Sequence, residues 1–360
     1  MIIKNGMIFS KDCEFEKVDI KFSDKIEKTG EIGDCDETFD ASGCYVIPGL
    51  VDIHTHGAIG IDASDETIDF EKWKSFLLKN GVTTFLPTTV TETKEALLKA
   101  VKNLENSDGI NLEGPFLSPA KKGAHDETKI CPVDLDFLSK IKHKVKITTI
   151  APEIYGNIEK IPDIVKMGIK VSLGHTTADY ETSKKAFEKG ASHITHSFNA
   201  MPAYLHRDPG VLGAAFDDES VFCEVISDGV HLHPSVVRMI YNVVGADRMI
   251  LISDAMRATG IDDGEYVLGG LEVVVKNRKA TLKDGTIAGG TSTLYDVLKS
   301  AVSFGIPLVD AVKMATATPS RAVGLCDNVG SLEAGKDADI LVLDKELNIV
   351  KVFYKGKSQI

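Results

Sequence analysis

Apolar runs of strand length alternate with amphipathic segments through the middle of the chain. The strand-like runs are residues 49–56, 82–90, 110–116, 144–151, 169–175, 192–199, 221–228 and 249–255. The segments between them, such as residues 70–77 and 178–187, have apolar residues at helical spacing. Eight βα units in series predict an α/β fold, a closed (β/α)8 barrel of the TIM type. A doubly wound open sheet is the alternative, although no glycine-rich dinucleotide loop follows the first strand.

The two ends of the chain have a different pattern, in which short apolar pieces are separated by polar turns. The pieces that predict strands are residues 2–3, 7–9 and 18–22 near the N-terminus, and residues 330–344 and 349–354 near the C-terminus. Neither end has enough apolar surface to fold alone. We therefore expect residues 1–48 and residues 326–360 to form one small β domain beside a barrel of residues 49–325. Residues 264–290 predict a β-hairpin insertion in that barrel.

Composition and charge bound the class of protein without indicating a reaction. The chain has 360 residues, 43% of them hydrophobic and 26% charged, as in an ordinary globular protein. The net charge of −12 argues against a nucleic-acid partner, although a local basic pocket could still bind an anionic ligand. The start of the chain lacks the apolar core of a signal peptide, and no apolar run approaches membrane-spanning length. We therefore expect a cytoplasmic protein with no membrane partner.

The cysteines favour the same location. The six of them are scattered without a C-x-x-C pair, at Cys13, Cys35, Cys44, Cys131, Cys223 and Cys326. Because this spacing is not that of a disulfide framework, it predicts the reduced thiols of an intracellular protein.

Polar residues of the types that bind metals stand where the predicted strands end. They are His54 and His56 after the first strand, Glu113 after the third, His175 after the fifth, His196 after the sixth and Asp254 after the eighth. Catalytic groups gather at the carboxyl ends of the strands in a βα barrel, so we expect these side chains to share one site. Any one of them could instead cap a helix or lie hydrogen-bonded in the core. Their recurrence at equivalent positions favours the functional interpretation.

Three of these residues form a candidate ligand set for a catalytic metal. Glu113, His175 and His196 offer one carboxylate oxygen and two imidazole nitrogens, which leaves a coordination position for water. A divalent ion in such a site lowers the pKa of its water and polarises a carbonyl group. Asp254 has the right chemistry for a general base that takes the proton of the water and returns it to a leaving amine.

The first strand offers a place for a second ion. A two-residue strand period puts Asp52, His54 and His56 on one face, so two imidazoles can point at one metal. Zinc and iron both fit nitrogen and oxygen ligands. We therefore expect one or two divalent ions per subunit, either zinc or iron.

Short motifs follow one another along nearly the whole chain. They are residues 48–56, 112–116, 121–125, 173–176, 195–201, 227–231 and 253–256, with Gly-x-x-x-x-Gly-x-Asp-Ala-Asp-Ile at residues 330–340. The ordered series, which includes His-Ser-Phe-Asn-Ala-Met, is highly specific. With these motifs the chain resembles the amidohydrolase superfamily and, within it, the family of N-acetylglucosamine-6-phosphate deacetylases.

That resemblance implies metal-dependent hydrolysis of N-acetyl-D-glucosamine 6-phosphate to D-glucosamine 6-phosphate and acetate, a step of amino-sugar metabolism. It implies Glu113, His175 and His196 as ligands of the catalytic metal, and Asp254 as proton acceptor and donor for a metal-activated water. The residues implied for the sugar phosphate are Ala124, His125, Asn199, Ala200, Arg207, His231, Ile287, Ala288 and Gly289. Some family members replace the first-strand histidines and use one metal, whereas this chain keeps both and is similar to the two-metal members.

The resemblance also implies a homodimer, because Arg207 in this family can approach the active site of the neighbouring subunit. The chemistry of the position agrees, since a guanidinium fork can grip a phosphate and His231 can give a charged hydrogen bond. Taken without the motifs, the two residues are better explained as a surface arginine and a loop histidine.

Two other functions stay open. One is a different amidohydrolase, such as a cyclic amidase or an N-acyl-amino-acid deacylase. Many of these are expected to carry a carboxylated bridging lysine, whereas this chain has Glu113 at the end of the third strand. The other is a catalytically silent barrel that senses a sugar phosphate, although binding alone needs no positioned base such as Asp254.

Overall fold

The computed structural model of this protein describes residues 1–33 and 37–360. Cys35, for which a reduced thiol is predicted, lies outside these residues. The other five cysteines are free thiols in the structure. In the described part of the chain, no helix is long and apolar enough to cross a membrane.

Eight strands form one parallel sheet in the order of the chain. They are β8 (Leu50–Thr55), β11 (Val82–Thr89), β12 (Ile110–Glu113), β13 (Val145–Ile150), β14 (Lys170–Leu173), β15 (His193–Ile194), β16 (Phe222–Val225) and β17 (Met249–Leu251). The segment after β17 bonds back to β8, since the N–H of Asp254 donates to the carbonyl of His54 at 2.9 Å. The N–H of His56 donates in turn to the carbonyl of Ala255 at 2.7 Å. With the parallel bridge between Thr55 and Ala255, these bonds close the sheet into a barrel, which confirms the predicted barrel and excludes the open doubly wound sheet.

Amphipathic helices follow most of the barrel strands. They are α1 (Phe70–Lys79), α2 (Lys94–Asn103), α3 (Leu135–Ile141), α4 (Asn157–Lys166), α5 (Tyr180–Glu188), α6 (Gly210–Asp217), α7 (Pro234–Val244), α8 (Leu294–Ser303), α9 (Leu308–Ala315) and α10 (Ala317–Ala322). In α1 the buried residues Phe70, Trp73 and Leu77 recur at helical spacing. The side chain of Asp69 caps this helix, because it accepts the N–H of Lys72 at 3.0 Å.

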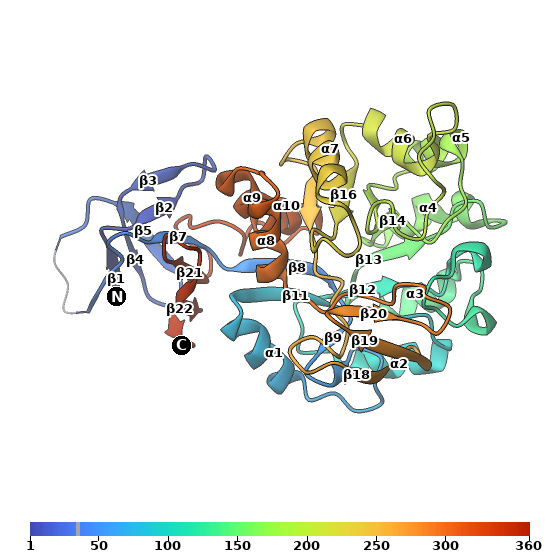
Figure 1. Cartoon of the computed structure of the whole chain (residues 1–360), viewed down its shortest axis with the longest axis horizontal. Helices are drawn as coiled ribbons and strands as arrows, with labels where there is room; N and C mark the ends of the chain where they lie inside the picture. The colour runs from blue at the N-terminus through green and yellow to red at the C-terminus, as the bar shows by residue number, and fades with distance from the viewer. Residues whose placement is uncertain (34–36) are drawn as a thin grey trace.

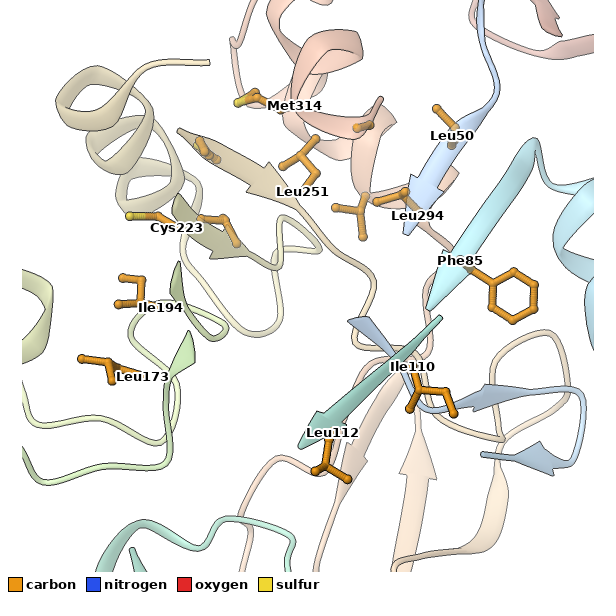
Figure 2. Close-up of a cluster of buried hydrophobic side chains, with 14 of the residues drawn as sticks. Leu50, Phe85, Ile110, Leu112, Leu173, Ile194, Cys223, Leu251, Leu294 and Met314 are labelled. Carbon is orange, nitrogen blue, oxygen red and sulfur yellow. The ribbon is translucent and has the colours of Figure 1, made fainter. Parts of the chain in front are cut away.

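The barrel wall separates two apolar layers. In the outer layer, Leu251 of β17 belongs to the same buried cluster as Leu294 of α8 and Met314 of α9 (Figure 2). In the inner layer, Ile250 of β17 clusters with Ile147 of β13, a strand four places away in the sheet. Neighbouring residues of one strand thus pack on opposite faces of the wall, which leaves the carboxyl ends of the strands for polar groups.

Both ends of the chain contribute to a small β domain beside the barrel (Figure 1). Its strands are β1 (Ile2–Lys4), β2 (Met7–Phe9), β3 (Phe15–Lys17), β4 (Asp19–Phe22), β5 (Ile26–Gly30), β6 (Thr38–Asp40), β7 (Tyr45–Pro48), β21 (Ile340–Leu343), β22 (Ile349–Tyr354) and β23 (Lys357–Ser358). β21 pairs antiparallel with β7, with Leu341 opposite Ile47. Ile3, Ile20 and Phe353 belong to one buried cluster, so the two ends share a core and the predicted fold class is confirmed.

Additional short strands lie outside these two parts. β18 (Gly264–Leu268), β19 (Leu271–Lys276) and β20 (Lys279–Thr281) form an antiparallel sheet, which adds a strand to the expected hairpin. β9 (Gly57–Ala58) pairs with β10 (Ile61–Asp62) directly after the first barrel strand. The division of the chain at residues 1–48, 49–325 and 326–360 stays a prediction.

Candidate active site

The strand-end residues meet around one buried carboxylate, that of Glu113 at the end of β12. Its Oε1 atom lies 3.2 Å from Nε2 of His175 and 2.9 Å from Nε2 of His196. Its Oε2 atom lies 3.2 Å from Nε2 of His56. His54 faces the same centre, with its Nε2 3.5 Å from Oε1 of Glu113. The structure thus brings histidines from the ends of β8, β14 and β15 together on a carboxylate of β12.

Asp254, which follows β17, completes this centre. Its Oδ1 atom lies 3.2 Å from Nε2 of His56 and 3.5 Å from Nε2 of His54. Burial alone would raise the pKa of Asp254, but these two imidazoles hold the pKa at about 2. The side chain is therefore a carboxylate, the form that can accept a proton. Asp52, expected on the same strand face as His54, bonds instead to the hydroxyl of Ser253.

The backbone bends sharply at three of these positions. His175, His196 and Asp254 have φ angles of 46°, 31° and 48°, in the left-handed region. This conformation costs a non-glycine residue roughly 1–3 kcal/mol, and such strain gathers at functional sites. The N–H of Gly290 supports the bend at Asp254 by donating to its carbonyl at 2.6 Å. A Cβ atom on Gly290 would lie 2.6 Å from the carbonyl oxygen of Ser253, so a glycine is required for this close approach.

Two histidines are held in the tautomer that presents a free Nε2 to the centre. Nδ1 of His56 lies 3.0 Å from the carbonyl oxygen of Thr88, and Nδ1 of His175 lies 2.8 Å from that of Lys121. A carbonyl oxygen only accepts hydrogen bonds, so each Nδ1 carries a proton, and once Nε2 has no proton its lone pair faces Glu113. Lone pairs and a carboxylate repel one another unless a cation lies between them. The donor set therefore fits a divalent metal ion.

Protons compete with a metal for the same place. Burial would lower the pKa of His56, but its hydrogen bonds to Asp254 and Glu113 raise the pKa to about 10. Burial would also lower the pKa of His54, but Glu113 and Glu224 raise it well above its usual value. A metal that binds these nitrogens must displace the protons, so acid should weaken its binding.

His125 is held in the opposite tautomer. The backbone N–H of Thr91 donates to its Nδ1 at 3.0 Å, so the proton of the neutral ring is on Nε2. Burial lowers the pKa of His125 to about 4, against the opposing effect of Glu113. Nε2 of His125 lies 3.4 Å from Oε2 of Glu113. His125 is therefore close enough to share a cation with Glu113 and His175, but its tautomer makes it a hydrogen-bond donor.

A cavity of about 570 Å³ opens onto this centre. The candidate substrate residues that line it are Ala124, His125, Asn199, Ala200, His231, Ile287 and Gly289. Leu268 of β18 and Leu282, just after β20, contribute to its wall from the inserted sheet. The insertion therefore encloses the cavity in which the strand-end residues lie.

Two residues that were predicted to bind the substrate do not line the cavity. Ala288 is fully buried in a small apolar cluster with Val90 and Met256. Arg207 is exposed, and its guanidinium group lies 2.6 Å from Nε2 of His206. Among the described residues that line the cavity, Arg207 is not found.

His231 is prepared to bind a negatively charged or hydroxyl oxygen. Its Nδ1 lies 2.7 Å from Oδ2 of Asp228, and its ring lines the cavity. Burial would lower the pKa of His231, but Asp228 raises it. A protonated His231 keeps one N–H on Asp228 and has the Nε2–H available as a charged donor.

Sequence patterns did not indicate two further residues that support the centre. Glu224 of β16 is fully buried, with Oε2 3.0 Å from Nδ1 of His54. A single carboxylate inside an apolar strand was the signal that could have found it. Glu153 accepts the N–H of Thr177 at 2.6 Å, two residues after His175. Glu153 lies in a loop, where its sequence context has no comparable signal.

The comparison with protein families places the chain. The model of the family described as "Amidohydrolase family" matches residues 45–358. The chain belongs to the amidohydrolase family. The match includes every strand of the barrel and confirms the family resemblance that the ordered motifs indicate.

The chain is similar to deacetylases of sugar phosphates. The N-acetylglucosamine-6-phosphate deacetylase of Bacillus subtilis (strain 168) is 35% identical, over 99% of this chain and 93% of the relative. The N-acetylgalactosamine-6-phosphate deacetylase of Escherichia coli O157:H7 is 31% identical, over 86% of each chain. A solved structure of a Mycobacterium smegmatis N-acetyl-D-glucosamine-6-phosphate deacetylase mutant, in complex with N-acetyl-D-glucosamine-6-phosphate, has 34% identity and a TM-score of 0.93. The match covers 100% of this chain and 99% of that chain.

Proposed function

We propose that this protein hydrolyses N-acetyl-D-glucosamine 6-phosphate to D-glucosamine 6-phosphate and acetate. The observation that carries the proposal is the pairing, around one centre that fits a metal, of a proton-accepting carboxylate, Asp254, with a neutral donor, His125. Amide hydrolysis needs both groups, whereas binding of a sugar phosphate needs no base. The cavity volume of about 570 Å³ is that of a small-molecule site, and the Bacillus subtilis relative is named for this reaction.

The metal would be held by Glu113, His175 and His196. When bound, a divalent ion supplies a Lewis acid that polarises the acetamide carbonyl and acidifies water. Asp254 accepts a proton from the water whose oxygen bonds to the carbonyl carbon. It then donates this proton to the nitrogen as the C–N bond breaks, so the sugar leaves as an amine. The Nε2–H of His125 donates to the carbonyl oxygen as negative charge develops there.

The sugar phosphate is oriented by the walls of the cavity. The side-chain amide of Asn199 and the charged Nε2–H of His231 offer hydrogen bonds to sugar or phosphate oxygens. Ala124, Ala200 and Gly289 are small and leave room for the ring. Ile287 supplies apolar contact.

A homodimer would supply the phosphate contact of Arg207. Arg207 is exposed and outside the cavity of its own chain, which supports a role in the site of the neighbouring subunit. Tyr204 and Leu205 in the same loop are 44% and 52% exposed, and apolar groups exposed together favour a protein contact. The guanidinium fork would then bind the phosphate across the interface.

The metal is zinc or iron, in one or two equivalents per subunit, with His54 and His56 as the place for a second ion. The nitrogen and oxygen donors support either element. A cytoplasmic location is supported by the five free thiols of the described residues, since oxidising compartments favour disulfides.

Acetate release from defined substrates tests the proposal. The protein should release acetate from N-acetyl-D-glucosamine 6-phosphate, lose this activity on chelation and regain it with added zinc or iron. Release should be much slower from unphosphorylated N-acetyl-D-glucosamine. The galactosamine epimer belongs in the same assay, because a relative is named for it.

The two rival functions predict other results in this assay. Equal turnover of the sugar with and without phosphate would favour a different amidohydrolase. Binding of the sugar phosphate without acetate release, with metal present, would favour a silent sensor.

A further inference from the structure

We infer that Glu224 is a positioning residue, which holds His54 in the tautomer and orientation of a metal ligand and so decides whether a second divalent ion binds. This role rests on the proposed metal-dependent function of the site. It is assigned to the carboxylate of Glu224 because that group contacts His54 on the side away from the centre.

The geometry constrains His54 from both sides. Oε2 of Glu224 lies 3.0 Å from Nδ1 of His54, and an ionised carboxylate only accepts hydrogen bonds. The proton of a neutral His54 is therefore on Nδ1, and Nε2 turns toward Glu113 and Asp254, 3.5 Å from an oxygen of each. Nε2 of His54 has no hydrogen-bond partner in the described part of the protein. Such an atom is suited to a metal.

The same carboxylate joins the two halves of the candidate metal site. Oε2 of Glu224 also accepts the backbone N–H of His196 at 3.3 Å. His54 is a candidate ligand of the second ion, and His196 is a candidate ligand of the first. Glu224 therefore contacts the ring of His54 directly and only the backbone of His196.

His54 differs from the other ligand candidates in what holds it. His56 and His175 are oriented by backbone carbonyls, which no substitution removes. His54 alone among these three is oriented by a charged side chain. A carboxylate partner also makes an imidazole a more basic ligand, and loss of such a partner weakens metal binding by about 10–100-fold.

Burial of Glu224 is costly without such a role. Its neighbours in β16 are Cys223 and Val225, all three side chains are fully buried, and Oε1 has no hydrogen-bond partner among the described residues. Removal of a carboxylate from water costs several kcal/mol. With Glu113 and Asp254, Glu224 places three carboxyl groups in one buried region, a composition that suits cations.

Zinc titration of the chelated full-length protein tests this role. We expect the wild type to bind two equivalents of Zn²⁺ in competition with a coloured chelator. Glu224→Gln, which has the same shape without the charge, should bind the second equivalent about 10–100-fold more weakly and the first nearly unchanged. Asp339→Asn, which alters a buried carboxyl group of the small β domain, should keep both affinities.

A double mutant separates positioning from a general effect on the fold. His54→Gln should lose the second equivalent of zinc. Adding Glu224→Gln to His54→Gln should cause no further loss of zinc affinity. A further loss there, or unchanged zinc affinities in Glu224→Gln alone, would overturn the role. If Glu224→Gln does not fold, nitrogen NMR of the zinc-loaded wild type decides the question. His54 with the proton on Nδ1 would support the role, and with the proton on Nε2 would refute it.

The outcome is independent of the proposed reaction, because zinc binding is measured without substrate. Two zinc equivalents, of which the second depends on Glu224, in a protein that releases no acetate, would leave the role intact and refute the proposed function. Acetate release by a protein whose zinc binding ignores Glu224 would do the reverse.

Discussion

The barrel mouth, where the carboxyl ends of the barrel strands meet, and the small β domain differ in the side chains that they bury. The small β domain closes over apolar side chains such as Ile3, Ile20 and Phe353. The mouth buries imidazoles and carboxylates, among them Glu113 and Asp254, and holds Asp254 in a left-handed backbone conformation. Burial of apolar surface stabilises a fold, whereas buried charge and backbone strain destabilise it. The mouth is therefore suited to a cation and a reaction, and the rest of the fold supplies its stability.

The largest expected effect comes from the base in the mouth. Asp254→Asn keeps the shape of the side chain but cannot accept the proton of water, so turnover should fall by about 10²–10⁴-fold. Zinc should still bind to the proposed ligands Glu113, His175 and His196. Acetate release and elemental analysis on the same samples check this, and near-normal turnover would remove Asp254 from its role.

Loss of the hydrogen-bond donor His125 should have the next largest effect on turnover. His125→Phe keeps a ring of similar volume without the Nε2–H, and turnover should fall by about 10²–10³-fold. Because the tautomer of His125 makes it a donor, the zinc content should not change, whereas the matched variant His175→Phe should lose zinc. Loss of zinc in His125→Phe would show that His125 is a ligand after all.

A buried carboxyl group in the small β domain should affect stability and not chemistry. Burial raises the pKa of Asp339 to about 7, against the backbone N–H of Lys355 that it accepts. The folded protein then binds this proton more tightly than the unfolded chain does. The resulting stabilisation is complete below about pH 4 and is lost as the pH rises through about 7.

Asp339→Asn removes this titration. Relative to the wild type, its free energy of unfolding should rise between about pH 4 and 8, by about 4 kcal/mol. Urea unfolding at several pH values measures the difference. A difference that does not vary with pH would show that the pKa of Asp339 is not raised.

The smallest expected effect is the change of zinc affinity per pH unit. The raised pKa values of His54 and His56 mean that zinc must displace protons. Affinity should therefore increase with pH, about tenfold per pH unit for each proton released. Calorimetry in buffers of different ionisation enthalpy counts these protons, and zinc binding without proton release would contradict the electrostatics of the mouth.

The sequence predicts the barrel and the convergence of the ligands for a clear reason. Apolar runs mark the strands, and the carboxyl ends of parallel strands in a closed barrel meet at one mouth. The predicted lengths of the strands are less accurate at the mouth of the barrel. The run at 192–199 forms only the short strand β15, because the backbone turns to positive φ at His196. Hydrophobic periodicity contains no signal for that bend.

The division of roles among the histidines could not be predicted from residue types. It depends on the partner of each Nδ1 atom, which is a carbonyl of Thr88 for His56 and an N–H of Thr91 for His125. These partners come from β11 and the loop after it, distant in sequence from His125. The contact of Glu224 with His54, across 170 residues, is of the same kind.

In the proposed reaction, a cation at the mouth enables the proton transfers of Asp254 and the hydrogen bond of His125. The most direct measurement titrates Zn²⁺ back into chelated protein while acetate release from N-acetyl-D-glucosamine 6-phosphate and bound zinc are followed together. Turnover should be absent in the chelated protein and rise in step with the first equivalent of zinc. Full turnover with no bound divalent metal, or none with the site filled, would contradict the claim.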